Sequence, residues 1–370
     1  MVAHHRPMMR AAAAASTTTT TTTTTTRRLR AVTFNIHSGI NQEEDAYSLE
    51  RIGRSAMGAT AEPVHFLCIQ EVERSAGAGQ RSRKWSWQHS DDQVEKLAAV
   101  TGLEHTLWAP ALHGIRYDPT VSTEEILHRD GEGDYGVAIL SALPFEDTRL
   151  LAYTVPTPAS SAELIYMDRE QQPRGAAAAL VRPEGAGSEG LLWVVTTHLS
   201  HLSGSEEQRG QARELMEWCD ALRAERGGCP LLLCGDMNSA PGAPGRRGPG
   251  SWHVVTGHSA AAAAEPSNWV DCWEVVHGEG DAGGLTCPSH NPRARIDQFF
   301  LPRDALPAER ASDSSSNANS SSADSSSGAG CVEAVDVKLI GAEDPHASDH
   351  LPVQLTIDFV GGGGTGRANL

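Results

Sequence analysis

The 370-residue chain lacks a long apolar run: no uninterrupted stretch approaches the roughly 20 residues that a membrane-spanning helix requires. It is also poor in basic residues, with 30 Lys and Arg against 47 Asp and Glu and a formal net charge of -17. Because non-specific affinity for a phosphate backbone comes from clustered Lys and Arg, this balance argues against a general nucleic-acid coat protein. A nuclease is still compatible, since bound divalent cations supply local positive charge.

Cysteine is present but does not suggest a disulfide framework. There are seven cysteines, an odd number, and Cys68 and Cys234 lie inside apolar strand-like runs. We therefore expect buried thiols in a reducing compartment. The hydrophobic content of 39% is sufficient for one large core or two modest ones. We expect a cytoplasmic monomer without a transmembrane segment.

Three compositionally biased segments fall outside the expected core. No acidic residue precedes Glu43, and residues 1–30 hold five Arg, five consecutive Ala and ten consecutive Thr. This composition predicts a disordered tail over residues 1–28, or alternatively an organellar transit peptide, which would place the protein in an organelle. We also expect a Ser-rich loop at about 303–331 and a disordered glycine-rich tail at 361–370, because neither can bury enough apolar area to become ordered.

The remaining chain, residues 29–360, alternates strand and helix patterns and is interpreted as one domain. Nine strand-like runs are expected, at Leu29–Ile36, Val64–Glu71, Tyr135–Leu140, Ala176–Val181, Leu191–Thr197, Pro230–Gly235, Ile296–Leu301, Val332–Ile340 and Pro352–Phe359. Several of them follow one another without a helix between them, which argues against a purely parallel sheet. Two mixed sheets packed face to face, with helices outside, accommodate this pattern better.

Three helices are indicated by capping residues and apolar periodicity. The first is expected from about Asp45 to Met57, before Gly58. The second follows the capping pattern that begins at Ser90 and ends near Gly102. The third is expected from Ser205 to about Gly227.

Polar residues gather at the ends of the expected strands. They are Asn35, Glu71, His198, Asp236, Asn238, Asp297, Asp349 and His350. Any one of them is equally well explained as a turn former or a helix cap. Six separate segments delivering carboxylate, amide or imidazole groups to strand ends are better explained by a shared site.

The residue types suit metal-assisted phosphoester chemistry. Mg²⁺ prefers oxygen ligands and keeps several waters, so Glu71 and Asp349, helped by the Asn35 amide, are sufficient protein ligands. The cation would polarise a phosphoryl oxygen and neutralise charge on the leaving group. Attack of a water molecule on the phosphate also requires a base that takes its proton, and Asp236 and His350 are both candidates for that base.

The other polar residues fit supporting roles in the same chemistry. Asn238 and His198 can donate hydrogen bonds to the phosphate. Asp297 can fix the tautomer of His350 and stabilise its protonated form.

Eight ordered motifs make the chain similar to a known family. They are Thr33–Gly39, Ile69–Val72, Tyr135–Ser141, Pro173–Ala176, Thr197–Ser200, Gly235–Asn238, Arg295–Asp297 and Ser348–His350. In this order they resemble the endonuclease/exonuclease/phosphatase superfamily, which is related to pancreatic-type deoxyribonuclease and abasic-site endonuclease. The similarity spans nearly all of residues 29–359.

The resemblance implies a four-layer α/β/β/α sandwich of two mixed sheets, with Mg²⁺ or Mn²⁺ at the open edge between the sheets. It also implies that Glu71 is the principal metal ligand, supported by Asn35 and Asp349. Asp236 and Asn238 would orient the nucleophile and the phosphate. It further implies that His198 contacts the phosphate and that Asp297 and His350 form an acid–base pair. Arg174 would lie near the phosphate; the alternative interpretation is an arginine on the surface.

The substrate is the least determined feature. The Asn35–Gly39 opening and the Thr286–Ser289 segment are similar to a small-hydrolase subgroup linked to GPI-lipid remodelling, which favours a lipid head group or small phosphodiester over nucleic acid. The alternatives are a DNA-repair type endonuclease and a non-catalytic binding module on the same fold. His37 and His201 lie near the motifs and could reach the site, but we interpret both as exposed loop histidines.

Overall fold

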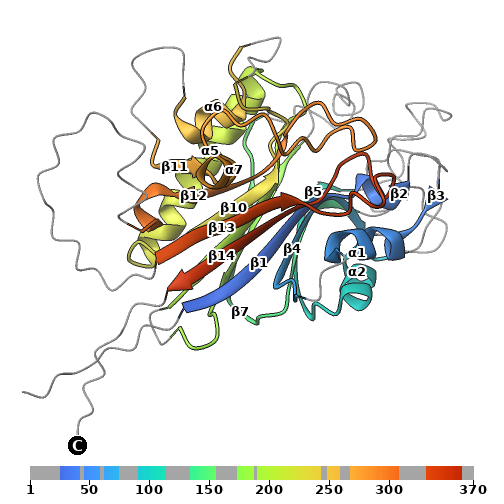
Figure 1. Cartoon of the computed structure of the whole chain (residues 1–370), viewed down its shortest axis with the longest axis horizontal. Helices are drawn as coiled ribbons and strands as arrows, with labels where there is room; N and C mark the ends of the chain where they lie inside the picture. Colours follow the sequence, from blue (N-terminus) through green and yellow to red (C-terminus); the bar gives the residue numbers. More distant parts are fainter. Residues whose placement is uncertain are drawn as a thin grey trace, which may run out of the picture.

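Two six-stranded mixed sheets form the centre of the protein in a computed structural model (Figure 1). The structure describes residues 26–41, 46–58, 62–74, 91–113, 134–155, 173–186, 190–242, 248–258, 267–307 and 331–360. The first sheet has the order β13 (Cys331–Leu339), β14 (Val353–Val360), β1 (Thr26–Asn35), β4 (Phe66–Arg74), β6 (Asp134–Ser141) and β5 (His105–His113). The second has the order β11 (Trp269–Asp271), β12 (Asp297–Pro302), β10 (Leu231–Asp236), β9 (Leu192–His198), β8 (Gly175–Val181) and β7 (Phe145–Ala152).

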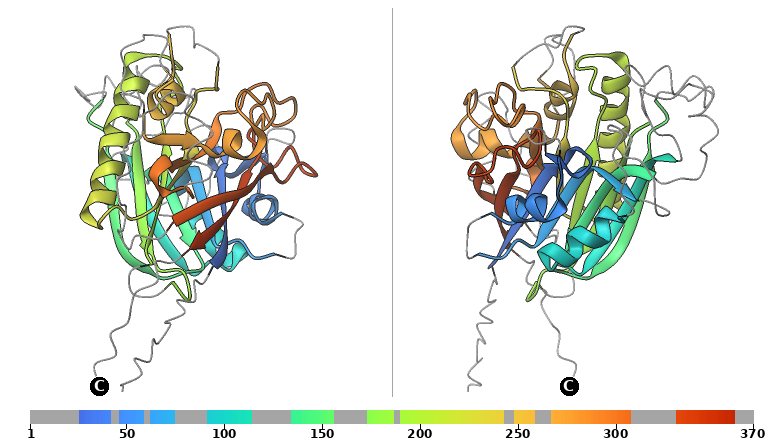
Figure 2. Two further views of the ribbon diagram at one scale, coloured as in Figure 1. Left: turned by 60° about the vertical axis from the view of Figure 1, so that its left-hand side comes forward. Right: turned by 90° about the vertical axis from the view of Figure 1, so that its right-hand side faces the viewer.

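Helices cover the outer faces of the two sheets (Figures 1 and 2). On the first sheet lie α1 (Leu49–Met57) and α2 (Gln93–Thr101), and on the second lie α5 (Glu206–Glu225) and α6 (Ser251–Thr256). The helix α7 (Cys272–His277) packs against the core between the sheets. Short elements complete the described chain: β2 (Ile40–Asn41), β3 (Ala46–Tyr47), η1 (His37–Gly39) and η2 (Arg303–Ala305).

Three apolar clusters correspond to the three interfaces of the sandwich. The clusters are separate because successive side chains of a strand point to opposite faces of its sheet. In β8, Ala177 and Ala179 face the core between the sheets, whereas Ala176 and Ala178 face α5. The expected four-layer α/β/β/α arrangement is therefore confirmed. Among the described helices, none is long and apolar enough to cross a membrane.

All nine expected strands are present, and the strands that were not expected lie at sheet edges or are very short. The edge strand β7 has mostly exposed or half-exposed side chains, so it lacks an apolar pattern. The edge strand β5 contains Pro110 next to a register shift, a position where proline is tolerated in a sheet. An edge strand needs only one paired side, and its sequence is correspondingly less constrained.

Several expected boundaries were wrong. The strand β1 begins at Thr26, inside the tail expected at 1–28, because Thr26 to Arg28 pair with the end of β14. The Arg28 side chain also donates two hydrogen bonds of 2.8 Å to Asp358. The first helix begins at Leu49, because Ser48 caps it, instead of near Asp45.

The second helix and the Ser-rich loop also differ from expectation. The helix α2 is capped by Asp92, whose carboxylate accepts bonds from two backbone amides. Arg303–Ala305 form η2 at the start of the loop expected at about 303–331. The rest of that expectation, at 308–330, lies outside the described residues, as do residues 1–25 and the tail at 361–370.

The seven cysteines are all free thiols, and five of them are buried. The expectation of buried, unpaired cysteines is therefore met for Cys68 and Cys234, which both lie in the core between the sheets. Cys287 and Cys331 are half-buried.

A buried ion pair ties β11 to the segment before β12. Arg295 Nη1 lies 2.5 Å from Asp271 Oδ2, and the two side chains are 4% and 0% exposed. The same carboxylate accepts bonds from the Trp252 indole of α6 at 2.8 Å and from the backbone amide of Trp273 in α7 at 2.9 Å. Asp271 therefore joins β11, α6 and α7 to Arg295, which lies two residues before the expected site residue Asp297.

We predict that Asp271→Ala lowers the free energy of unfolding by about 3–5 kcal/mol, because it leaves the Arg295 guanidinium buried without its partner. Chemical denaturation would measure the loss. The matched control is Asp336→Ala, which removes an ion pair to Lys338 whose side chains are both 44% exposed. The control should change stability by less than about 0.5 kcal/mol, and a similar loss in both variants would contradict the prediction.

Candidate active site

Strand direction brings the expected site residues to one edge of the sandwich. The pair β1/β4 in the first sheet and the pair β9/β10 in the second are parallel. Asn35, His198 and Asp236 are the last residues of β1, β9 and β10, and Glu71 lies near the end of β4. The flanking strands β14 and β12 run antiparallel to β1 and β10, so the residues before or at their starts, His350 and Asp297, reach the same edge.

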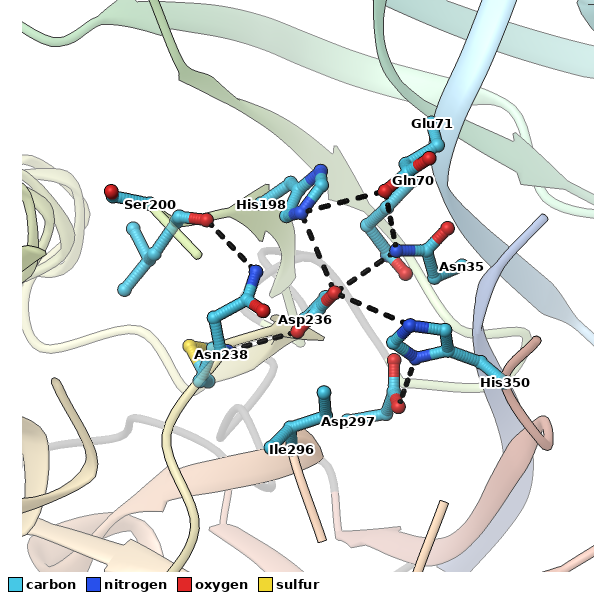
Figure 3. Close-up of polar contacts among 12 residues, drawn as sticks. Asn35, Gln70, Glu71, His198, Ser200, Asp236, Asn238, Ile296, Asp297 and His350 are labelled. Atoms are coloured by element: carbon cyan, nitrogen blue, oxygen red, sulfur yellow. Dashed lines mark hydrogen bonds and ion pairs between the residues drawn. The ribbon is translucent and has the colours of Figure 1, made fainter. Parts of the chain in front are cut away.

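Asn35 connects the two sheets at this edge. Its amide nitrogen donates to Glu71 Oε1 at 3.2 Å and to Asp236 Oδ2, in the opposite sheet, at 2.9 Å. Its amide oxygen accepts from the backbone of His37 at 3.1 Å, which orients the NH₂ group toward the carboxylates. Figure 3 shows Asn35, His198 and His350 converging on Asp236.

Local backbone distortions aim two site side chains. Glu71 has a φ of 55° and sits at a register shift between Gln70 and Val72 in the pairing of β4 with β6. Such a bulge re-aims a side chain that a regular strand would point elsewhere. Asn238 has a φ of 50°, and its backbone amide donates to Asp236 Oδ1 at 2.9 Å, an Asx turn.

The residue before Asp236 must be glycine. Gly235 has a φ of 142°, and a Cβ atom placed there would lie 2.0 Å from the carbonyl oxygen of Thr197. The parallel strands β9 and β10 therefore approach closely where Asp236 enters the site.

The tautomer of His198 follows from its neighbour Arg174. Arg174 Nη1 lies 2.8 Å from His198 Nδ1, and because a guanidinium can only donate, Nδ1 accepts and the ring proton is on Nε2. Nε2 lies 3.4 Å from Asp236 Oδ2 and 4.0 Å from Glu71 Oε1. Arg174 is 5% exposed, so the surface alternative was wrong. Its buried Nε has no hydrogen-bond partner, which leaves one donor for a ligand.

His350 and Asp297 form a buried imidazole–carboxylate pair. The distance from His350 Nδ1 to Asp297 Oδ2 is 2.7 Å, and the side chains are 7% and 0% exposed. Burial alone would lower the pKa of His350, but the carboxylates of Asp297 and Asp349 outweigh it and raise that pKa well above its usual value. His350 Nε2 faces Asp236 Oδ2 at 3.9 Å.

The segment Thr286–Ser289 supports this pair, although the sequence assigned it no role in the site. Thr286 Oγ1 accepts from the backbone of Asp297 at 3.4 Å, and the Thr286 carbonyl accepts from Leu351 at 2.9 Å. Ser289 donates through its hydroxyl to Ser348 O at 2.6 Å and through its backbone to Asp349 O at 2.8 Å. One turn therefore sets the positions of both partners. No side-chain pattern announces this function, because backbone carbonyls receive most of the bonds.

The donor set fits a hard divalent cation. Oxygens of Glu71, Asp236, Asp297 and Asp349 crowd the edge, and burial together with the Asp297 charge raises the pKa of Asp236 to about 7. A cation would relieve this accumulation of negative charge, and carboxylate oxygens are ligands that Mg²⁺ and Mn²⁺ prefer.

The three residues whose potential metal-binding atoms lie closest together are not the three metal ligands expected from the sequence. Ligand atoms of Asp236, Asp297 and His350 all lie within 4.8 Å of one another. The bond from His350 Nδ1 occupies Asp297 Oδ2, an arrangement that suits an acid–base pair. We therefore keep Glu71, Asn35 and Asp349 as the predicted metal ligands.

One interpretation from the sequence was wrong. His37 is 5% exposed, not an exposed loop residue, and its Nδ1 lies 3.9 Å from Asp349 Oδ1. His201, in contrast, is exposed as expected. Both histidines lie in or next to a motif, and only the folded chain shows that His37 is buried and His201 is exposed.

Comparisons with known proteins agree with this geometry. The model of the Endonuclease/Exonuclease/phosphatase family matches residues 32–350. An endonuclease/exonuclease/phosphatase from Beutenbergia cavernae is a similar solved structure, with 22% identity, a TM-score of 0.59, and coverage of 91% of this chain and 72% of that one. No curated protein sequence matches significantly.

Two further solved structures share the fold at low identity. A mannosyl-6-phosphatase from Bacteroides thetaiotaomicron has 11% identity and a TM-score of 0.53, with 89% of this chain and 99% of that chain covered. The human Nocturnin catalytic domain with bound sulfate has 14% identity and a TM-score of 0.52, with 91% and 97% covered.

The Arg174–His198 contact predicts a single histidine tautomer. We expect ¹⁵N NMR to show His198 protonated on Nε2 alone when the ring is neutral, and Arg174→Met to produce a mixture, because the donor to Nδ1 is lost. Arg174→Lys, which still donates, should retain the single form better. The control Arg149→Met, on the exposed strand β7, should leave the His198 signals unchanged. An Nδ1-protonated ring in the unmodified protein would contradict the assignment.

Proposed function

The chain belongs to the endonuclease/exonuclease/phosphatase family, and we propose that it hydrolyses a phosphodiester bond with the help of Mg²⁺ or Mn²⁺. The observation that carries this proposal is the convergence on Asp236. Its Oδ2 accepts from Asn35 at 2.9 Å and lies 3.4 Å from His198 Nε2 and 3.9 Å from His350 Nε2. An acidic group surrounded by one amide and two imidazoles is suited to proton transfer beside a bound phosphate.

Glu71, Asn35 and Asp349 are the residues that would hold the metal. When bound, the cation would polarise a phosphoryl oxygen and neutralise charge on the leaving group. The Asn35 amide nitrogen donates to Glu71 Oε1 at 3.2 Å, so Asn35 also orients this carboxylate beside the proposed metal. Metal-bound waters would complete the coordination, as is usual for Mg²⁺.

The remaining site residues are assigned to the phosphate and to the proton. His198 presents its Nε2 proton toward the site, and Arg174 has a buried Nε donor available, so both are proposed to bind non-bridging oxygens. Asp236, oriented by the backbone of Asn238, is proposed to accept the proton of the attacking water. The pair of His350 and Asp297 would provide the second proton-transfer group.

A small or lipid phosphodiester is the proposed substrate class. The formal net charge of -17 is unfavourable for binding a long nucleic-acid backbone. The fold does not select the substrate, since a structure named as a mannosyl-6-phosphatase shares it with one named only as an endonuclease/exonuclease/phosphatase. A DNA-repair type endonuclease is the second candidate. A non-catalytic binding module is disfavoured because every proposed acid–base group is retained at the edge.

We expect hydrolysis of bis-p-nitrophenyl phosphate that requires Mg²⁺ or Mn²⁺ and stops with EDTA. His350→Ala should lower kcat by about 10²–10⁴-fold, as expected for loss of a general acid or base. Glu71→Gln removes a ligand charge at nearly constant volume, so it should abolish the metal-dependent rate. Steady-state kinetics with p-nitrophenolate release would measure both.

The matched control is Glu104→Gln, which makes the same change at an exposed position after α2. Its rate should equal that of the unmodified protein. Full activity in Glu71→Gln, or activity that persists in EDTA, would contradict the proposed role of the metal. Absence of turnover with this and other diesters would favour the binding module.

The substrate class can be tested by direct competition. We expect a glycerophosphodiester carrying a lipid-type head group to be hydrolysed with a higher kcat/KM than an oligonucleotide duplex containing an abasic site, because electrostatic repulsion opposes the polyanion. Raising the salt concentration should improve only the duplex reaction if repulsion limits it. Preferential cleavage of the duplex at low salt would instead support the repair endonuclease.

A further inference from the structure

Backbone strain in the described chain is concentrated at the site. Four non-glycine residues there have positive φ: Glu71 at 55°, Asn238 at 50°, His37 at 48° and Ser38 at 57°. The first two are proposed site residues. Residues held in sparsely populated backbone regions cost about 1–3 kcal/mol each and cluster at functional sites. The same distortion at His37 and Ser38, directly after the Asn35 strand end, calls for an explanation.

Other elements hold the strained turn in place. Gly39 N donates to Ile36 O at 2.8 Å, closing the turn. The fully buried Gln93, at the start of α2, donates to Ser38 O at 2.8 Å and accepts from Glu73 N at 2.7 Å. The buried Gln93 side chain therefore joins the turn to β4 by two hydrogen bonds, which indicates that the shape of the turn is required.

The turn places His37 between two predicted metal ligands. Its backbone amide donates to Asn35 Oδ1 at 3.1 Å. Its imidazole is buried, and Nδ1 lies 3.9 Å from Asp349 Oδ1, which is within ion-pair range but longer than a hydrogen bond. The same oxygen of Asp349 lies 3.4 Å from the Ser348 hydroxyl. His37 thus contacts Asn35 through its backbone and faces Asp349 through its ring.

We propose that His37 is a positioning residue for the metal site: its imidazole holds the Asp349 carboxylate in the orientation that binds the divalent cation. This inference rests on the proposed function, because it assumes that Asp349 is a ligand. Groups that orient metal ligands typically change metal affinity by about 10–100-fold when they are removed.

Two substitutions separate the imidazole from the strained backbone. His37→Gly removes the ring while suiting a φ of 48°, since glycine adopts positive φ without steric cost, and it keeps the backbone bond to Asn35. His37→Asn places an amide nitrogen near the position of Nδ1, and asparagine also tolerates this conformation. His201→Gly is the matched control, because it removes an exposed imidazole three residues after His198.

The experiment is titration of Mn²⁺ into the metal-free protein, with free Mn²⁺ measured by electron paramagnetic resonance. We expect the Kd to rise by at least about tenfold in His37→Gly and to stay within about threefold of the unmodified value in His37→Asn and His201→Gly. Thermal unfolding of the metal-free variants would verify that each is folded.

The outcomes distinguish this inference from the proposed function. An unchanged Kd in His37→Gly, with normal Mn²⁺ binding and hydrolysis by the unmodified protein, would overturn the role of His37 and leave the proposed function intact. An equal loss of affinity in His37→Gly and His37→Asn would also overturn it, because a polar nitrogen at the position of Nδ1, facing Asp349, would not matter. Failure of the unmodified protein to bind Mn²⁺ would overturn both.

Discussion

The site depends on the hydrogen bond from Asn35 to Asp236, which joins the two sheets at one edge. The bond forms at the edge where the carboxyl ends of the parallel pairs β1/β4 and β9/β10 meet. Below it, Gln70 donates to Thr196 of the opposite sheet at 2.9 Å. These polar contacts between otherwise apolar faces set the relative position of the sheets, and with it the distances among Glu71, His198 and Asp236.

Around that bond, several site residues are held in locally unfavourable conformations or surroundings. Positive φ angles at Glu71 and Asn238 and a cluster of buried carboxylates all cost free energy. The three apolar clusters provide the opposing stability, because burial of apolar surface is the dominant favourable term in folding. The ion pair of Asp271 with Arg295 extends this support to the segment that carries Asp297.

Much of the fold was predictable because interior strands must be apolar on both faces. That is why β1, β4, β9 and β10, all of them interior strands, were found from the sequence, and why the polar residues at their ends stood out. The edge strand β7 was missed because its side chains are largely exposed, and the edge strand β5 because its mostly half-buried side chains and Pro110 interrupt an apolar pattern. The start of β1 was misplaced because Thr26 is ordered by pairing with Val360, far away in the sequence.

The sequence by itself determined the sandwich, the family resemblance and the identity of the polar residues at the strand ends, since these follow from apolar periodicity and local motifs. Only the tertiary structure decided that Arg174 sets the tautomer of His198, that Thr286 and Ser289 support the Asp297–His350 pair, and that His37 is buried against Asp349. The physical reason is that these roles depend on distances between segments distant in the chain. No local pattern encodes such distances, because they arise when strand direction and packing bring the segments to one edge.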